Sequence, residues 1–228
     1  GGCGKRGEFE RSSCNAKLMQ ADLFSYRAVP AIQSPFVSSV FIFSLFRMNS
    51  FFRPLPWTAD SNIYEVNLRQ YTADGSFRAF EAHLPRLRDM GVEILWFMPI
   101  TPISVKGRLG SLGSYYACSD YLSTNPEFGT LEDFKFLVQS AHRQGFKILI
   151  DWVANHTGLD HHWTSGHPEF NRRNDEGQFF EANGWQDVID LNYDVPELRE
   201  TMIRCMEFWV NECDIDGFRC DMAMLVPL

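Results

Sequence analysis

The stretch Asp214-Ile-Asp-Gly-Phe-Arg-Cys-Asp-Met-Ala223, near the end of the 228-residue chain, alternates apolar and polar side chains. In its second half, apolar Phe218 and Cys220 alternate with polar Arg219 and Asp221. This pattern predicts a short β-strand in which Arg219 and Asp221 point to one face, because side chains two residues apart share a face. A guanidinium beside a carboxylate holds the carboxylate ionised, as a nucleophile or a charge stabiliser requires. A salt bridge at the end of a strand is the alternative interpretation.

Further strands and helices are predicted upstream of this strand, from residue 62 onward. Strands are expected at residues 63–68, 92–98, 148–150 and, within the stretch above, 216–221. Helices are expected from Ser76 to Gly91, from Thr130 to Gly145 and from Pro196 onward, and Pro85 should kink the first of them. Buried strands that alternate with helices indicate an α/β fold with a parallel sheet and right-handed crossovers.

The connections that run from a helix to the next strand are short, and those that run from a strand to the next helix are long. Each helix is followed closely by a strand, whereas long segments separate strands from the next helix, at residues 69–75, 99–129 and 154–195. The extra sequence therefore lies at the carboxyl ends of the strands, which is the ligand-binding face of barrels and doubly wound sheets. Residues 154–195 are numerous enough to form a small inserted subdomain. The chain contains no G-x-G-x-x-G and no G-x-x-x-x-G-K-[ST] motif, so a nucleotide site is not indicated.

The composition is that of a globular protein, with 45% hydrophobic and 22% charged residues. A net charge of −8 argues against a nucleic acid as the partner. The six cysteines form no regular framework, and Cys205, Cys213 and Cys220 are expected to be buried thiols because each sits in an apolar pattern. A reducing compartment fits slightly better, which favours the cytoplasm over secretion.

Residues 1–60 lack the regular pattern of the remainder and are expected to form an irregular, disordered leader. The apolar run at residues 35–46 is too short to span a bilayer as a helix, so no membrane span is expected. Its length suits the core of a signal peptide, but it begins far from the first residue. We expect the ordered protein to start near Met48, and we interpret the residues before it as upstream sequence that has been read through as part of the chain. A genuine amphipathic or signal-like extension is the alternative.

Candidate functional residues gather at the predicted strand ends. Carboxylates, aromatic rings and neutral hydrogen-bonding groups are the side chains that a sugar site needs. Aromatic rings stack on sugar faces, amides and imidazoles bind hydroxyls, and carboxylates stabilise a transition state resembling an oxocarbenium ion. A zinc site is not indicated, because no set of spaced ligands is present. The candidates are Asp151, Asn155 and His156 after the third strand, Arg219 and Asp221 in the fourth, Tyr115, Tyr116, Asp120 and Tyr121 in the loop after the second, and His161, His162, Trp163, Trp185 and Asp190 in the inserted segment.

From residue 62 onward the chain resembles the α-amylase family of retaining α-glycosidases, glycoside hydrolase family 13. The resemblance implies the N-terminal half of a (β/α)8 TIM barrel, strands 1 to 4, with an inserted domain B at about residues 154–195 after strand 3. Residues 61–228 would then form a partial catalytic domain. The motifs that carry the resemblance are Asp151-Trp-Val-Ala-Asn-His156, Gly217-Phe-Arg-Cys-Asp-Met-Ala223, Asp187-Val-Ile-Asp-Leu-Asn-Tyr193 and Gly113-Ser-Tyr-Tyr-Ala-Cys-Ser-Asp-Tyr121.

The resemblance also implies a role for individual residues. Asp221 matches the nucleophile of the family, and Arg219 matches the residue that orients it. His156 and Tyr116 match residues that hold the sugar, and Asp151 supports the site from the third strand. Trp163 is expected to contact substrate as well.

A calcium ion is implied at Asn155 and Asp190, whose positions bind calcium in many family members. Met224 and Leu225, however, stand where calcium-binding amylases have a Lys-His pair. Apart from calcium, no cofactor is expected.

The family's acid/base Glu follows a fifth strand, and a further catalytic Asp follows a seventh, whereas this sequence stops at Leu228, just after the fourth. We therefore expect a fragment that is inactive by itself, from a glycoside hydrolase that acts on α-glucosidic linkages of an α-glucan or oligosaccharide. The alternatives are a glucan transglycosylase and a non-catalytic relative, such as the heavy subunits of amino-acid transporters. Asp221 beside Arg219, together with His156, favours an enzyme, because a binding module does not need a nucleophile.

Overall fold

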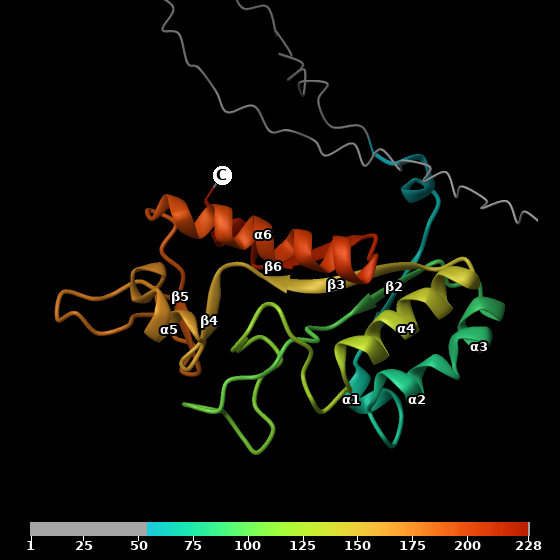
Figure 1. Cartoon of the computed structure of the whole chain (residues 1–228), viewed down its shortest axis with the longest axis horizontal. Helices are drawn as coiled ribbons and strands as arrows, with labels where there is room; N and C mark the ends of the chain where they lie inside the picture. Colours follow the sequence, from blue (N-terminus) through green and yellow to red (C-terminus); the bar gives the residue numbers. More distant parts are fainter. Residues whose placement is uncertain (1–53, 228) are drawn as a thin grey trace, which may run out of the picture. The chain divides into compact units, whose positions relative to one another are not determined.

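The computed structural model describes residues 54–227, and at their centre lies a parallel sheet of four strands. The strands are β1 (Ile63–Val66), β2 (Ile94–Phe97), β3 (Lys147–Val153) and β6 (Gly217–Asp221), paired in that spatial order. Neighbours in space are thus also successive βα units along the chain (Figure 1). The predicted α/β fold is confirmed. The predicted start near Met48 lies outside the described residues. The same holds for the predicted leader at residues 1–60, of which only residues 54–60 are described.

Two long helices pack beside the sheet (Figure 1), and both contribute buried side chains to the hydrophobic core. They are α4 (Leu131–Arg143) and α6 (Pro196–Cys213), and each begins at the helix-start residue that the sequence predicts. Thr130 and Asp133 form a reciprocal capping box at the start of α4, while a proline occupies the first turn of α6. Phe134 of α4 meets Trp209 of α6 at 5.8 Å between ring centres, and both rings are fully buried. Figure 1 shows α6 running beside β3 and β6.

The structure corrects three details of the prediction between residues 63 and 91. β1 ends at Val66, two residues earlier than the expected strand at 63–68. A short helix, α1 (Leu68–Tyr71), then occupies positions that were expected to be the end of that strand and the start of a loop. The expected kinked helix is two separate helices, α2 (Phe77–Glu81) and α3 (Leu84–Asp89). Pro85 lies in the first turn of α3, where the missing N–H costs no helical hydrogen bond, so a new helix starts there instead of a kink forming.

Two predictions at the last strand are also corrected. β6 begins at Gly217, one residue later than expected, and the Asp216 carboxylate just before it accepts hydrogen bonds from the Lys147 side chain and the Ile148 N–H. Cys220 is exposed, although Cys205 and Cys213 are buried as expected. A short 3-10 helix, η3 (Ala223–Leu225), follows the strand.

The segment between β3 and α6 forms a small unit with its own sheet. Its strands β4 (His156–Gly158) and β5 (Val188–Asp190) pair in antiparallel fashion, so that His156 lies opposite Asp190. Between them lie α5 (Trp163–Gly166) and the 3-10 helix η2 (Pro168–Phe170). Because β4 follows β3 after only two residues, this unit stands at the carboxyl end of the main sheet (Figure 1).

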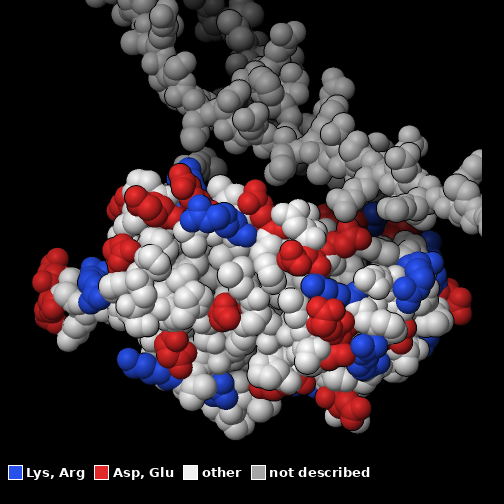
Figure 2. All heavy atoms as spheres, viewed as in Figure 1, with Lys and Arg blue, Asp and Glu red and all other residues white. Residues whose placement is uncertain are grey.

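Acidic and basic side chains are interspersed on the face of the molecule shown in Figure 2, without a continuous basic stripe on that face. At the other end of the described chain a further 3-10 helix, η1 (Pro56–Thr58), precedes β1. Within residues 54–227 no helix has both the length and the apolar character needed to cross a membrane.

Candidate active site

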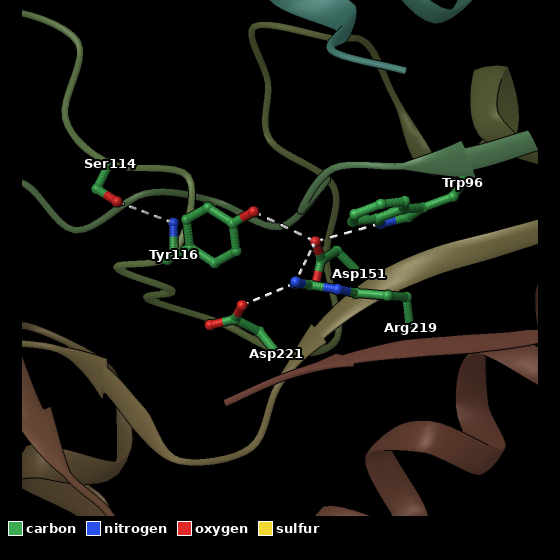
Figure 3. Close-up of polar contacts among 6 residues, drawn as sticks. All are labelled: Trp96, Ser114, Tyr116, Asp151, Arg219 and Asp221. Carbon is green, nitrogen blue, oxygen red and sulfur yellow. Dashed lines mark hydrogen bonds and ion pairs between the residues drawn. The ribbon is translucent and has the colours of Figure 1, made fainter. Parts of the chain in front are cut away.

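Arg219 connects two carboxylates that come from neighbouring strands. In the pairing of β3 with β6, Asp151 lies opposite Arg219, and Asp221 follows two residues later on the same face of β6. Nη1 of Arg219 donates to both oxygens of Asp151, at 3.0 and 3.1 Å, and to Oδ1 of Asp221 at 2.7 Å (Figure 3). The face-sharing that the sequence predicts for Arg219 and Asp221 is therefore present, and the register of the sheet adds Asp151 as a third member.

Asp151 is in turn fixed by groups from the second strand and the loop that follows it. Its side chain is fully buried, and its Oδ2 accepts from Trp96 Nε1 at 3.2 Å and from the Tyr116 hydroxyl at 3.4 Å. The guanidinium of Arg219 also lies over the ring of Trp96, 4.7 Å from its centre. Arg219 is thus held by a buried anion on one side and an aromatic face on another, which leaves little freedom for its direction.

The protonation of these groups follows from burial and from their mutual charges. Burial raises the pKa of the Asp151 carboxyl to about 6, although the hydrogen bonds and charge of Arg219 oppose this shift. Burial by itself would lower the pKa of Arg219, but the contacts with both carboxylates raise that pKa above its usual value. Burial, together with the charges of Asp151 and Asp221, raises the pKa of Tyr116 to about 12. Arg219 is therefore cationic and Tyr116 is a neutral hydroxyl donor at neutral pH.

A pocket of about 240 Å³ opens beside this cluster. Its walls combine the end of β6 with the loop after β2 and with the inserted unit. The backbone turns into the left-handed region directly after Asp221, at Met222 with φ of 48°, which ends the strand at the pocket. The lining residues are Ser114, Tyr116, His156, Trp185, Asp187, Val188, Asp221 and Met222.

His156 enters the pocket as a buried imidazole. Burial lowers the pKa of His156, against the opposing charges of Asp221, Asp187 and Glu181. Its Nδ1 lies 3.2 Å from the Asn155 side-chain amide, and its ring centre is 5.1 Å from that of Trp185. The ring is therefore neutral at pH 7 and offers a hydrogen bond to a hydroxyl without adding positive charge.

Trp163 does not join the other predicted substrate-contacting residues. Its side chain is 3% exposed and packs against Tyr121, His161 and Phe170, so it belongs to the core beneath the inserted unit. The tryptophan that lines the pocket is Trp185. Both lie in the same irregular segment, and no periodicity of the sequence distinguishes the buried ring from the one at the pocket.

A second hollow, of about 590 Å³, is larger but does not have the features of a reaction site. Its residues include Asp120 and Asp160, whose carboxylates are already used by neighbouring groups. Asp160 accepts from the Ser104 hydroxyl and from the Val105 and Lys106 N–H groups. We therefore place the candidate site at the smaller pocket, where Asp221 and its arginine lie.

Asn155 and Asp190 line a third hollow, of about 130 Å³. Oδ1 of Asp190 is buried without a hydrogen-bond partner, and an oxygen donor of this kind suits calcium. Leu225 and Arg172 also line the hollow. Within residues 54–227 no group of three or more His, Cys, Asp or Glu side chains converges on a metal position, so a bound calcium would need carbonyl or water oxygens in addition.

Comparison with known proteins assigns the chain to a family. Residues 57–184 and 167–227 match the model of the alpha amylase catalytic domain. The chain belongs to the α-amylase family. This result confirms the resemblance drawn from the four motifs, and the parallel strands β1, β2, β3 and β6 are the N-terminal portion of the family's TIM barrel.

Similar proteins within the α-amylase family have several different names. "Alpha-amylase 3" of Dictyoglomus thermophilum is 30% identical over 196 residues, which cover 74% of this chain and 37% of that protein. "Oligo-1,6-glucosidase" of Parageobacillus thermoglucosidasius is 26% identical and covers 75% of this chain and 36% of the relative. A crystal structure of an alpha-amylase from Lactobacillus plantarum is 43% identical, with a TM-score of 0.71 over 73% of this chain and 39% of the other. The chain thus spans well under half the length of these relatives.

Proposed function

We propose that the full-length protein is a glycoside hydrolase that cleaves α-glucosidic linkages of oligo- or polysaccharides with retention of configuration, and that Asp221 is its nucleophile. The observation that carries this proposal is the bridge from Arg219 to Asp151 and Asp221 at the mouth of a pocket lined by Tyr116 and His156. Membership of the α-amylase family, in which relatives are named as amylases and glucosidases, supports the choice of linkage.

The reaction divides into two displacements. In the first, an oxygen of Asp221 attacks the anomeric carbon while the bond to the leaving sugar oxygen breaks, and that oxygen takes a proton from a general acid. In the second, water attacks the same carbon, the bond to Asp221 breaks, and the acid recovers its proton from the water. The hydrogen bond from Arg219 occupies Oδ1 of Asp221. We assign the attack to Oδ2.

The remaining pocket residues bind and orient the sugar. Tyr116 presents its ring to the pocket while its hydroxyl is tied to Asp151. That arrangement suits stacking on the apolar face of a sugar. His156 is neutral and offers a hydrogen bond to a sugar hydroxyl. The cationic Arg219 offsets one of the two carboxylate charges before the glycosyl ester forms, and it balances the charge of Asp151 once Asp221 is esterified.

The general acid is assigned through the family resemblance and not to a residue of this chain. The retaining mechanism places two carboxyl groups about 5 Å apart. Among the described residues that line the pocket there is no glutamate. The resemblance assigns the acid to a Glu after a fifth barrel strand, and for this reason the activity is proposed for the full-length protein.

Transfer to a second sugar is the other candidate reaction. If a sugar hydroxyl replaces water in the second displacement, the same ester yields a new glycosidic bond. A relative from Thermus thermophilus that is 31% identical carries the name "Trehalose synthase", which supports this possibility. Hydrolysis and transfer share Asp221 and differ in how the pocket admits water.

We also propose that Asn155 and Asp190 hold a calcium ion between the end of β3 and β5. The support is the donor chemistry of Asp190, whose Oδ1 is buried and unpartnered. Such an ion would tie the inserted unit to the sheet and would take no part in bond cleavage.

The test uses 4-nitrophenyl α-glucoside and the full-length protein. Asp221→Asn should lower kcat by roughly 10⁴-fold or more, because the ester can no longer form. Asp214→Asn is the matched control, since Asp214 is an exposed aspartate beside the same strand, with 88% of its side chain accessible. Proton NMR of the first product from the wild type should show the α-anomer. An Asp221→Asn enzyme with wild-type kcat, or a β-anomeric first product, would contradict the proposal.

A further inference from the structure

Two side chains of the inserted unit, Trp185 and Asp187, line the pocket of Asp221 and have no part in the mechanism above. They lie two residues apart, just before and at the entry to β5 (Val188–Asp190). The inserted unit thus contributes an aromatic ring and a carboxylate to the site. Trp185 was already a candidate from the sequence, whereas the position of Asp187 at the pocket is known only from the structure.

Trp185 is held by a local turn. The carboxylate of Glu181 accepts from the N–H of Asn183 at 2.5 Å and from the N–H of Trp185 at 2.7 Å. The ring of Trp185 lies 5.1 Å from that of His156 and is partly exposed. An accessible ring carried on a backbone that is held in place can stack on a ligand at a small entropic cost.

Asp187 is a buried residue whose carboxylate has one buried oxygen without a hydrogen-bond partner among the described residues. The residue is 6% exposed, and the unpartnered oxygen is its Oδ2. None of the ion pairs within residues 54–227 involves Asp187, in contrast to Asp221, which is paired with Arg219. Asp187 faces His156, and its charge raises the pKa of His156 against the larger lowering by burial. A buried polar group left unpaired costs stability, so its presence at a pocket points to a role toward a ligand.

We propose that Asp187 sets the charge preference of the pocket, favouring cationic and neutral sugars over anionic ones, and that Trp185 supplies a stacking face that is indifferent to charge. This proposal rests on the proposed function, because it assumes that the pocket binds a sugar. Arg219 is engaged by Asp151 and Asp221, so the pocket wall formed by the inserted unit presents an unbalanced negative charge. A phosphate or carboxylate on the sugar would be repelled there, while hydroxyl and ammonium donors would be attracted.

The experiment measures the affinity of the full-length protein for three probes by isothermal titration calorimetry. The probes are 1-deoxynojirimycin as a cationic sugar mimic, maltose as a neutral sugar and glucose 6-phosphate as an anionic one. Wild type should bind them in that order of affinity. Asp187→Asn should lower the affinity for the cationic probe and raise the affinity for the anionic probe, each by roughly tenfold, because it removes one unit charge a few ångströms from the probe. Trp185→Ala should weaken all three probes by a similar factor, roughly tenfold, and leave their ratios unchanged.

Two controls separate recognition from folding. Asp175→Asn changes an exposed aspartate of the same inserted unit and should alter neither affinities nor ratios. The thermal midpoint of unliganded Asp187→Asn should equal or exceed that of wild type, because the substitution removes an unpaired buried charge. If Asp187→Asn fails to fold, Asp187→Ser offers the same test of charge with a smaller side chain.

The outcomes distinguish this inference from the function on which it rests. Unchanged cation-to-anion ratios in a folded Asp187→Asn protein, with all probes still bound, would overturn the inference alone. A wild-type protein that binds none of the three probes would overturn both the sugar site and the inference. A shift in the ratio for Asp175→Asn as large as that for Asp187→Asn would also overturn it, since the effect would then be a general one of net charge.

Discussion

Arg219 shows how a single side chain can organise a site. One of its nitrogens, Nη1, contacts three oxygen atoms of two carboxylates from neighbouring strands. The pairing of Arg219 with Asp221 could be predicted, because a period of two fixes which side chains share a strand face. The contact with Asp151 follows from the sheet register, which depends on how whole strands pair and is not written in any local pattern.

Asp151 gives a pH-dependent prediction at this scale. Its pKa is raised in the folded protein to about 6 from an ordinary value of 3.8. Between these values the folded state binds more protons than the unfolded state, so the contribution of Asp151 to stability falls as pH rises from about 4 to 6 and is constant above that. Relative to Asp151→Asn, wild type should lose at most about 3 kcal/mol of unfolding free energy over this window.

The measurement for this prediction is urea unfolding of both proteins at pH 4, 5, 6 and 7. Titrating groups that do not interact with Asp151 are shared by the two proteins, so their effects cancel in the difference. Two curves that run parallel from pH 4 to 6 would contradict the raised pKa of Asp151.

The inserted segment shows where residue-level prediction failed. Trp163 and Trp185 are both tryptophans in an irregular stretch, yet one is in the core and the other lines the pocket. Their surroundings come from residues far away in sequence, such as Tyr121 for Trp163. His156 could be found because it lies just after the end of β3, where the topology brings side chains together. Tyr116 lies well beyond the end of β2, and the motif that resembles the family identified it.

At the scale of elements, strands and helices could be predicted but not all of their boundaries. The capping box of Thr130 and Asp133 fixed the start of α4, because two side chains satisfy the free N–H groups there. No comparable signal marked the break between α2 and α3 or the early end of β1. Pro85 permits both a kink and a new start, and tertiary contacts decide between them.

The proposed calcium site gives a prediction about how two elements are joined. If Asn155 and Asp190 bind calcium, the ion raises the free energy of unfolding. Once the calcium concentration exceeds the dissociation constant, this gain grows with the logarithm of the concentration. The thermal midpoint of the full-length protein should therefore rise with added calcium, and Asp190→Asn should abolish most of that rise. Scanning calorimetry in buffers with calcium or with a chelator provides the data. An equal rise in both proteins would place the ion elsewhere.

At the scale of the whole molecule, the described sheet has two free edges. Within residues 54–227, β1 pairs only with β2, and β6 pairs only with β3. Unpaired edges of a sheet tend to associate with other chains. The 228-residue chain expressed alone should therefore form concentration-dependent assemblies and show no turnover of 4-nitrophenyl α-glucoside. Size-exclusion chromatography with light scattering checks the first point, and a soluble monomer with activity that is lost on Asp221→Asn would contradict both.

The central claim is that Asp221 forms the covalent bond to the sugar, and trapping of the ester tests it most directly. The full-length protein is incubated with 5-fluoro-α-glucosyl fluoride, whose activated leaving group needs little help from a general acid and whose ester is hydrolysed slowly. Peptide mass spectrometry should find one fluoroglucosyl group on Asp221, absent in Asp221→Asn and present in Asp214→Asn. A label on any other residue, or equal labelling of Asp221→Asn and wild type, would contradict the account.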